Sequence, residues 1–404
     1  AGTEGSAVSL SANDVAAGSY RLSGLSPRTV YYVALTNSQA PEGAEDYNVR
    51  RFRTGGMPAG AVSVTDGADL YARIKAGMED ASLSELVFCL QNGVDYYLNE
   101  EGAADGKTGT IALTKSIALL AEPGEHPTLY VREGGFQVGT DPHIDYFIVE
   151  NVDVEENVSD NSRGSKTYLF GVGKRSAGND CTIDRFELVN SAVMLPTGVI
   201  MMNEANDGVT TINHIHIDNC RVTGINDTKL VTKQFGFIHA PKKGGNVWND
   251  VRVTNSTFYE FYISPGVFGS LTADATVTEG GNVSISNCTF YNWATKKTSY
   301  TAVGDFSELA VPLNLSVSGC LFGYSAGKIL DAGVCNTTVR NNYCTTDFEQ
   351  LSSPGLTLVS LDTTDEALFL DAAAGDFTLI DGSSVVYQQE YGDPRWIPVD
   401  ADVK

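Results

Sequence analysis

The sequence predicts an all-β protein whose larger part is a right-handed parallel β-helix. The first observation is composition: 41 glycines, with many Val, Thr, Asn and Ser residues, favour strands and turns over helices. The second is a strand pattern that recurs along the chain with loops of variable length, which is typical of a solenoid. The third is that no repeat unit carries a helical 3.6-residue pattern, which disfavours helical and leucine-rich repeats.

The recurring pattern places two alternating apolar positions before Asn, a small residue, any residue and an apolar or aromatic one. It occurs in FIVENVDV (147–154), IHIDNCRV (215–222), VRVTNSTF (251–258), VSISNCTF (283–290) and LSVSGCLF (315–322). IDRFEL (183–188) and TVRNNYCT (338–345) fit with Arg185 and Asn342 in the Asn position. That position therefore falls at residues 151, 185, 219, 255, 287, 319 and 342.

Each repeat unit also contains a second, shorter apolar strand. These strands are YLFGVG (168–173), VIMMN (199–203), FGFIHA (235–240), GVFGS (266–270), TAVGD (301–305) and KILDAG (328–333). Propeller blades need about 40–45 residues and four strands, so they fit this spacing less well. Stacked coils of short parallel strands fit it best.

The cysteines indicate packing rather than disulfides or a metal site. There are seven, an odd number, and none forms a CxxC pair. Cys220, Cys288 and Cys320 follow the Asn position directly, where Ser256 stands in another unit, so we expect a column of small core residues. The adjacent side chains should form a ladder of amides bonded to the backbone and to each other; they are Asn151, Asn219, Asn255, Asn287 and Asn342.

The N-terminal segment has a different pattern. YRLSGLSPRTVYYVAL (20–35) carries L-x-P-x-T-x-Y-x-V, in which the hydroxyl of Tyr31 is expected to bond back to the nearby backbone as a tyrosine corner. RRFRTGG (50–56) then reads as a last strand. The segment resembles the second half of a fibronectin type III domain over about residues 8–56. The resemblance implies a partial β-sandwich at 1–56, whose first strands are expected upstream, acting as a spacer without chemistry.

The rest of the chain resembles the pectate-lyase-like β-helix proteins that Gram-negative polysaccharide degraders display or secrete beside glycan-uptake systems. The resemblance rests on DGADLYARIKAG (66–77), SELVFCLQNGVDYYL (84–98), TGTIALTKSIALLAEPGEHPTLYV (108–131) and GDFTLIDGSSVVYQQEYGDPRW (375–396). It implies a β-helix with an N-terminal capping helix at 60–345 and a closing segment at 346–404, with Trp396 covering the helix end. It also implies a monomer outside the cell or on the outer-membrane surface, compatible with an upstream lipid anchor.

The charge limits the partners. The chain has 50 acidic and 27 basic residues, a net charge of −23, which argues against binding nucleic acid. No apolar run approaches the roughly 18 residues of a membrane helix. An anionic polymer would need a local basic patch or bound cations to offset the repulsion.

The ends of the second strands carry polar side chains that would line one groove, because neighbouring coils lie about 4.8 Å apart. The candidate bases for abstracting a proton from a uronate are Lys174, Arg175, His239 and Lys242. The candidate substrate contacts are Asn203, Glu204 and Lys243, and the candidate calcium ligands are Glu204 and Asp305. The alternative is that strand ends simply lead into solvated polar loops.

Aromatic residues form a second candidate binding surface. Trp248, Tyr262 and Trp293 are expected on loops after successive coils, where their rings would stack on sugars or, alternatively, pack beneath the loops. His214 and His216 alternate along a strand, so both face one side as a metal pair or as plain strand surface.

The function expected from these features is the binding of an acidic polysaccharide. The R-x-P-x-x-R-like segment of true pectate lyases is absent, which favours binding without catalysis. A pectate-type lyase acting by β-elimination is the alternative, and an adhesive or structural role stays open. The N-x-D and paired Asp signatures of polygalacturonase-type hydrolases and the G-x-S-x-G elbow of serine hydrolases are also absent.

Overall fold

The chain divides into two compact units, Ala1–Ala59 and Gly60–Lys404. The computed structural model describes residues 8–26, 28–34, 49–106, 109–132, 135–138, 143–157, 168–172, 180–202, 208–224, 236–239, 245–261, 268–269, 281–293, 301–307, 309, 311–350 and 356–398.

The first unit contains a short helix and one antiparallel strand pair among its described residues. The elements are α1 (Ala12–Ala17), β1 (Val30–Ala34) and β2 (Val49–Arg53). The backbone N–H of Ser26 donates to the Tyr31 hydroxyl at 2.9 Å, which is the bond expected of a tyrosine corner. The Tyr31 ring also stacks on Phe52, with ring centroids 5.8 Å apart.

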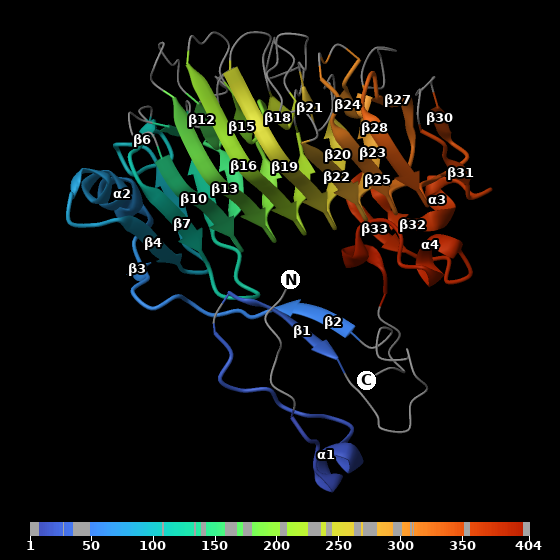
Figure 1. The fold of residues 1–404 in the computed structure, drawn as a ribbon, viewed down its shortest axis with the longest axis horizontal. Helices are drawn as coiled ribbons and strands as arrows, with labels where there is room; N and C mark the ends of the chain where they lie inside the picture. Colours follow the sequence, from blue (N-terminus) through green and yellow to red (C-terminus); the bar gives the residue numbers. More distant parts are fainter. Residues whose placement is uncertain are drawn as a thin grey trace. The chain divides into compact units, whose positions relative to one another are not determined.

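The second unit is a right-handed parallel β-helix with three long sheets (Figure 1). Sheet 1 contains β3 (Val62–Val64), β4 (Glu85–Leu90), β7 (Ser116–Leu120), β10 (His143–Glu150), β13 (Cys181–Val189), β16 (Val209–Asp218), β19 (Gly245–Thr254), β22 (Asn282–Ser286), β25 (Asn314–Ser318) and β28 (Asn336–Arg340). Sheet 2 contains β5 (Asp95–Leu98), β8 (Thr128–Val131), β11 (Asp153–Glu156), β14 (Ala192–Met194), β17 (Arg221–Thr223), β20 (Thr257–Phe261), β23 (Thr289–Trp293), β26 (Leu321–Phe322), β29 (Tyr343–Cys344) and β31 (Val359–Ser360).

Sheet 3 carries the second apolar strands that the sequence predicted. It contains β6 (Ile111–Leu113), β9 (Phe136–Val138), β12 (Phe170–Val172), β15 (Ile200–Met201), β18 (Ile238–His239), β21 (Phe268–Gly269), β24 (Thr301–Asp305), β27 (Ser325–Asp331) and β30 (Phe348–Gln350). Each coil passes from sheet 1 to sheet 2 and then to sheet 3, and neighbouring coils pair in parallel.

The turn from sheet 1 to sheet 2 explains the recurring Asn. Asn151, Asn219, Asn255 and Asn287 have φ between 50° and 59°, and Gly319 has φ 64°. This left-handed conformation is accessible mainly to Gly and Asn, so one residue is enough to turn the chain between sheets. The repeat that looked like one strand is therefore two short strands on either side of a sharp corner.

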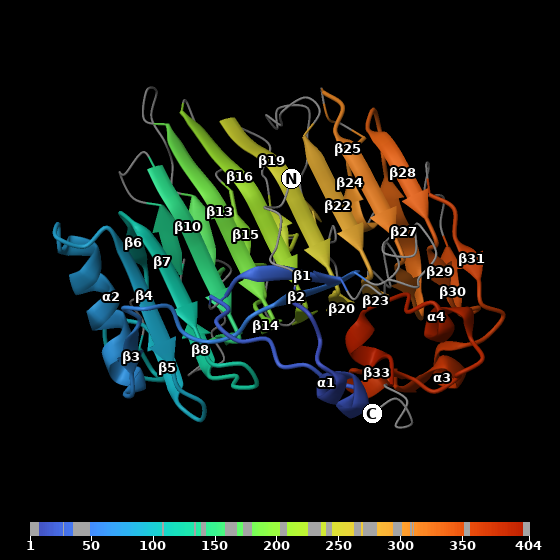
Figure 2. The same cartoon turned by 60° about the horizontal axis from the view of Figure 1, so that its bottom comes forward.

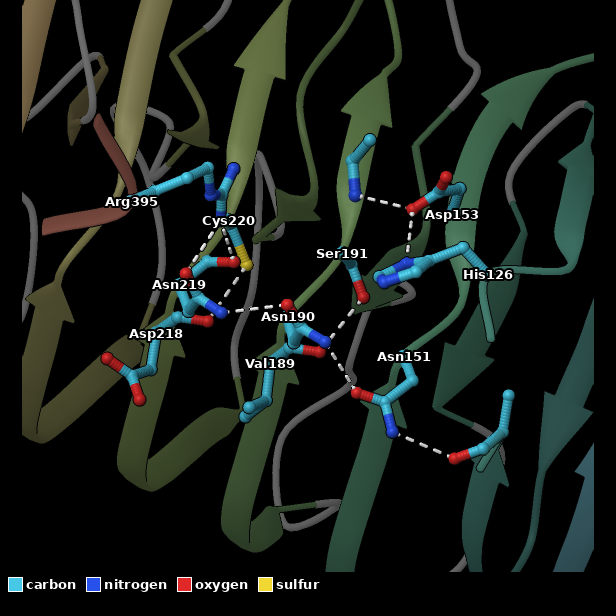
Figure 3. A network of polar contacts seen from close by, with 12 residues as sticks. His126, Asn151, Asp153, Val189, Asn190, Ser191, Asp218, Asn219, Cys220 and Arg395 are labelled. Atoms are coloured by element: carbon cyan, nitrogen blue, oxygen red, sulfur yellow. Dashed lines mark hydrogen bonds and ion pairs between the residues drawn. The ribbon is translucent and has the colours of Figure 1, made fainter. Parts of the chain in front are cut away.

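The Asn side chains form the predicted ladder over the first coils (Figure 3). Asn151 Nδ2 donates to Ala121 O at 2.8 Å, and Asn190 Nδ2 donates to Asn151 Oδ1 at 2.8 Å. Asn219 Nδ2 continues the series to Asn190 Oδ1 at 2.7 Å. Beyond that point the pattern changes, because Asn255 Nδ2 donates to Asp218 Oδ1 instead.

Two residues assigned to the Asn position of the repeat, Arg185 and Asn342, were wrong. Tyr146 pairs with Arg185 and Glu150 with Val189, so the corner residue of this coil is Asn190, not Arg185. The sequence pattern of β13 is compatible with a corner at Arg185 or at Asn190, because this strand is longer than the repeated motif. Ser318 likewise pairs with Arg340, which places Asn341 at the last corner and moves Asn342 one position further.

The position after the corner forms the predicted column of small core residues. Cys220, Cys288 and Cys320 are fully buried, and Ser256 lies between the first two. The Ser256 hydroxyl accepts the Cys220 backbone N–H at 3.0 Å. Burial raises the pKa of the Cys220 thiol to about 12 and raises that of Cys288 as well. Asn342 ends the column, and its Oδ1 accepts the Cys320 N–H at 3.0 Å.

Helix α2 (Leu70–Glu79), after the 3-10 turn η2 (Gly67–Asp69), is the helix expected at the start of the coils. It buries Leu70 and Ile74 and packs against β4, β5 and β6. Gly77 packs closely on Leu86, since a Cβ there would lie 2.6 Å from Leu86 Cδ2 and the leucine side chain would have to shift.

The C-terminal segment, residues 365–398, lies along the outer face of sheet 2 rather than over the helix end (Figures 1 and 2). Its elements are α3 (Asp365–Leu368), β32 (Phe369–Asp371), η3 (Ala372–Ala374), β33 (Asp376–Leu379), α4 (Val385–Gln388) and η4 (Pro394–Trp396). The Phe377 ring packs on Tyr259 and Tyr291, with centroids 5.4 and 5.2 Å apart.

Trp396 was expected to cover the end of the β-helix, and this was wrong. Its Nε1 donates to Thr257 Oγ1 of β20 at 2.6 Å, on the side of the coils. Arg395 reaches further back and donates to Asn219 Oδ1 at 2.8 Å (Figure 3). The segment packs against the side of the β-helix because sheet 2 carries outward tyrosines, which contact its aromatic rings, and outward threonines, which bond to its polar groups.

Candidate functional site

The outer face of sheet 2 carries a hollow of about 340 Å³ over the first coils. We call it the tyrosine hollow, and it is lined by Tyr97, Ala104, Tyr130, Glu155, Glu156, Asn157 and Met194. Its volume is at the lower end of the range of small-ligand pockets, about 300–1,000 Å³.

Strand alternation positions the side chains of the hollow. Tyr97 of β5 pairs with Tyr130 of β8, which pairs with Glu155 of β11, and Glu155 pairs with Met194 of β14. Their strand neighbours Leu98, Leu129, Val154 and Val193 point inward and are buried. Because side chains alternate along a strand, the four outward residues form one column across four coils.

The two tyrosine rings are stacked. Their centroids lie 5.2 Å apart with an angle of 15° between the ring planes. A stack of two rings leaves each ring one face that the other does not cover. Met194, which is 43% exposed, adds a flexible apolar side chain at the far end of the column.

A loop held by Asn99 forms the rim of the hollow beside Ala104. Asn99 is fully buried, its Nδ2 donates to Ala103 O at 2.9 Å, and its Oδ1 accepts the Ala103 N–H at 3.2 Å. Gly106 packs directly on this amide, since a Cβ there would lie 2.1 Å from Asn99 Oδ1. The rim is therefore fixed to the first coil rather than freely extended.

The electrostatics of the hollow are dominated by carboxylates. Burial raises the pKa of Glu155, and the charges of Asp153 and Asp95 raise it further. Burial also raises the pKa of the Tyr130 hydroxyl, and the charges of Asp95 and Glu155 raise it further. The buried Arg132 donates to Asn157 O at 3.5 Å. The lining side chains thus offer aromatic surface together with carboxylate and amide groups.

The same column continues into the part of sheet 2 that the C-terminal segment covers. Met194 pairs with Thr223, Thr223 with Tyr259, and Tyr259 with Tyr291. At those two tyrosines the outward rings are packed against Phe377. One face of the β-helix is therefore occupied by the chain's own aromatic side chains at one end and hollowed at the other.

Most of the site residues predicted from the sequence cannot be placed. Seven lie outside the described residues: Lys174, Arg175, Asn203, Glu204, Lys242, Lys243 and Tyr262. The groove and its basic side chains therefore stay predictions. Asp305 ends β24 and is exposed, with its Oδ1 accepting the Ser307 N–H at 3.0 Å. Its role as a calcium ligand also stays a prediction.

His239 lies in β18 and is 5% exposed. Burial lowers the pKa of its imidazole to about 4, so the ring is neutral at neutral pH. Its Nδ1 accepts the Gly236 backbone N–H at 3.4 Å. The ring is in the protonation state of a base, but it is shielded from solvent by the surrounding chain.

Trp248 and Trp293 do not lie on loops, which corrects that expectation. Trp248 is in β19 and Trp293 in β23, and their exposed fractions are 0% and 1%. Their rings fill the interior between the sheets, so neither offers a face to a sugar. His214 and His216 share the outward face of β16, and His214 Nδ1 lies 3.4 Å from Asp250 Oδ2.

The sequence carries one signal for the hollow in the strand segments of Tyr97 and Tyr130. DYYL and TLYV place Tyr97 and Tyr130 out of phase with the inward leucines, so alternation alone predicts that both face outward. What could not be predicted is that they are direct neighbours, since this depends on the register between coils.

The comparison of this chain with known proteins finds one family, whose description names no function. A family model described as a domain of unknown function (DUF5123) matches residues 283–396. No curated protein and no solved structure matches the chain. The matched range runs from β22 to Trp396, so it includes the last coils and the segment that covers sheet 2, and it does not include the hollow. Among the described residues, no helix is long and apolar enough to cross a membrane.

Proposed function

We propose that this chain binds a polysaccharide, and that the tyrosine hollow is where a sugar unit sits. The observation that carries the proposal is the stacked Tyr97–Tyr130 pair beside Glu155 and Asn157. A pyranose ring has apolar C–H faces, which pack on aromatic rings, and hydroxyl groups, which donate to carboxylate and amide oxygens. An extended polymer suits a face built from regularly spaced coils.

The charge of the hollow favours an uncharged sugar over the acidic glycan expected from the sequence. Glu155 and Glu156 line it, and Asp95 and Asp153 act on the same groups. A uronate or sulfated sugar would add a like charge to a site where burial already disfavours carboxylate ionisation. Four of the basic residues that suggested an acidic glycan lie outside the described residues: Lys174, Arg175, Lys242 and Lys243. The fifth, His239, is buried and neutral. We also propose that the protein acts outside the cell, where polysaccharides occur.

Packing elsewhere on the same face supports aromatic recognition. Tyr259 and Tyr291 stand in the same outward column as Tyr97 and Tyr130, and they bury Phe377 of the C-terminal segment. An outward tyrosine column on this sheet therefore suits a flat, largely apolar partner. At the hollow, we propose that the partner is a sugar ring.

The test compares binding of uncharged and acidic polysaccharides by affinity electrophoresis and calorimetry. We expect the chain to bind at least one uncharged polysaccharide, such as a β-glucan, xylan or mannan. Tyr130→Ala should weaken that binding by at least about tenfold, which equals about 1.4 kcal/mol, because aromatic contacts usually dominate such interfaces. Tyr130→Phe should retain most of the affinity, because it keeps the ring.

Tyr324→Ala is the matched control, since Tyr324 is 47% exposed and lies outside the hollow. It should leave the affinity unchanged. Unchanged binding by Tyr130→Ala and Tyr97→Ala, or no binding to any uncharged polysaccharide, would rule out the hollow as the site. A rise in absorbance near 235 nm with polygalacturonate would instead support the lyase alternative.

A further inference from the structure

A second cluster of polar groups lies on the outer face of sheet 1. His143 and Asp145 stand two residues apart on β10, so both point outward, and Asp184 is the neighbour of Asp145 on β13. His143 Nε2 lies 3.0 Å from Asp145 Oδ1 and 3.2 Å from Asp184 Oδ2. The ligand atoms of all three residues lie within 4.8 Å of one another.

These separations fit three ligands around one metal ion. Imidazole nitrogen and carboxylate oxygen bind Zn²⁺ and similar ions at about 2.0–2.2 Å. Two ligands of such an ion are about 3.0 Å apart at octahedral angles and about 3.4 Å apart at tetrahedral angles, and both distances measured from His143 Nε2 fall in this range. The side chains of His143, Asp145 and Asp184 are 52%, 74% and 45% exposed, so water can complete the coordination.

The carboxylate of Asp184 is oriented by a chain of amides. Asn213 Nδ2 of β16 donates to Asp184 Oδ1 at 2.8 Å, and Asn249 Nδ2 of β19 donates to Asn213 Oδ1 at 2.7 Å. With Oδ1 engaged, Oδ2 is the oxygen that faces His143. The Asp145 backbone N–H donates to Ser116 Oγ at 3.0 Å, which ties β10 to the preceding coil. Second-sphere bonds of this kind fix ligand orientation in metal sites.

We propose that His143, Asp145 and Asp184 bind a divalent first-row metal ion, with Zn²⁺ or Mn²⁺ as the expected type. A nitrogen ligand shared with two carboxylates suits these ions better than Ca²⁺ or Mg²⁺, which prefer oxygen ligands alone. An ion pair among the same exposed groups would contribute only about 0–1 kcal/mol. The net charge of −23 favours cations over anions as partners of the chain as a whole.

The test is calorimetric titration of the full chain, stripped of metal, with ZnCl₂ and separately with MnCl₂ at neutral pH. Binding of Mn²⁺ is followed in parallel by electron paramagnetic resonance. We expect one saturable site per chain. His143→Gln and Asp184→Asn should each weaken it by more than tenfold, and Asn213→Ala by about 10–100-fold, through loss of orientation of Asp184. All three positions are at the surface or partly exposed, and thermal unfolding checks that the variants fold.

His126→Gln is the matched control, because His126 Nδ1 lies 3.3 Å from the single carboxylate of Asp153 in a His–Asp pair elsewhere on the coils (Figure 3). Its replacement should not change metal affinity. Equal binding by wild type and His143→Gln, or only weak binding at many sites up to millimolar metal, would overturn the proposal.

Discussion

Replacing Phe290 with Ala is expected to lower the free energy of unfolding by about 3–5 kcal/mol. Phe290 is fully buried and stacks between Phe258 and Phe322, with centroids 5.4 and 5.0 Å apart. The three rings occupy equivalent positions of successive coils, so removing the middle one leaves a cavity with an aromatic wall on both sides. Urea denaturation followed by circular dichroism measures the loss.

The control for this substitution is Leu370→Ala, at a residue of the same unit that is 60% exposed. Its effect should stay within about 0.5 kcal/mol, because no packed interior is disturbed. If Phe290→Ala and Leu370→Ala had equal effects, the stacked column would not be a main source of stability.

Replacing Asp393 with Asn is expected to change how stability depends on pH. Asp393 is 1% exposed, and its carboxylate accepts the Thr257 hydroxyl at 2.7 Å and the Arg395 N–H at 3.0 Å. Burial raises its pKa to about 6, against an opposing effect of Arg395 and with a smaller raising effect of Asp218. In the unfolded chain the pKa of Asp is about 3.9.

The folded protein therefore binds this proton more tightly than the unfolded chain. The contribution of Asp393 to stability is fully present below pH 4 and is lost as the pH rises through about 6. Asn cannot ionise, so the variant should gain stability relative to wild type between pH 4 and pH 7, by up to about 3 kcal/mol. Urea denaturation at both pH values measures the difference.

Asp381→Asn is the matched control, with the opposite sign. Hydrogen bonds from Ser383 lower the pKa of Asp381, so its contribution is present at neutral pH and lost as the pH falls. That loss occurs mostly below the unfolded pKa of about 3.9, so the stability difference between this variant and wild type should change little between pH 4 and pH 7. A stability difference between Asp393→Asn and wild type that is the same at both pH values would show that Asp393 is not held as a buried carboxyl.

The fold was predictable because each coil repeats the same local requirement. The corner residue needs a left-handed backbone, and Asn219, Asn255, Asn287 and Gly319 supply it. The next position is buried, and in five successive coils it holds a cysteine or serine: Ser191, Cys220, Ser256, Cys288 and Cys320. Arg185 was misplaced because apolar alternation shows which side chains face inward but not where a long strand ends.

The candidate site was less predictable because it depends on neighbours from different coils. Tyr97, Tyr130 and Glu155 meet only through the parallel pairing of β5, β8 and β11, and loops of unequal length hide that register in the sequence. For Trp248 and Trp293 the sequence predicted surface positions that the structure does not have. Aromatic residues near strand ends suggested a surface, but the space between the sheets is wide enough to bury both rings.

The position of the C-terminal segment against the side of the β-helix could not be predicted from the sequence either. Asp393 and Trp396 bond to Thr257, which precedes them by more than a hundred residues. Nothing in the DPRW motif distinguishes a side attachment from an end cap, since both would use a tryptophan and a buried acid. The outward tyrosines of β20 and β23 determine where the segment packs.

The most direct test of the central claim is a crystal structure of the chain with the uncharged oligosaccharide that binds best. We expect a sugar ring against Tyr130, with its hydroxyls bonded to Glu155 or Asn157 in the tyrosine hollow. An oligosaccharide bound on another face, with the hollow holding no sugar, would contradict it.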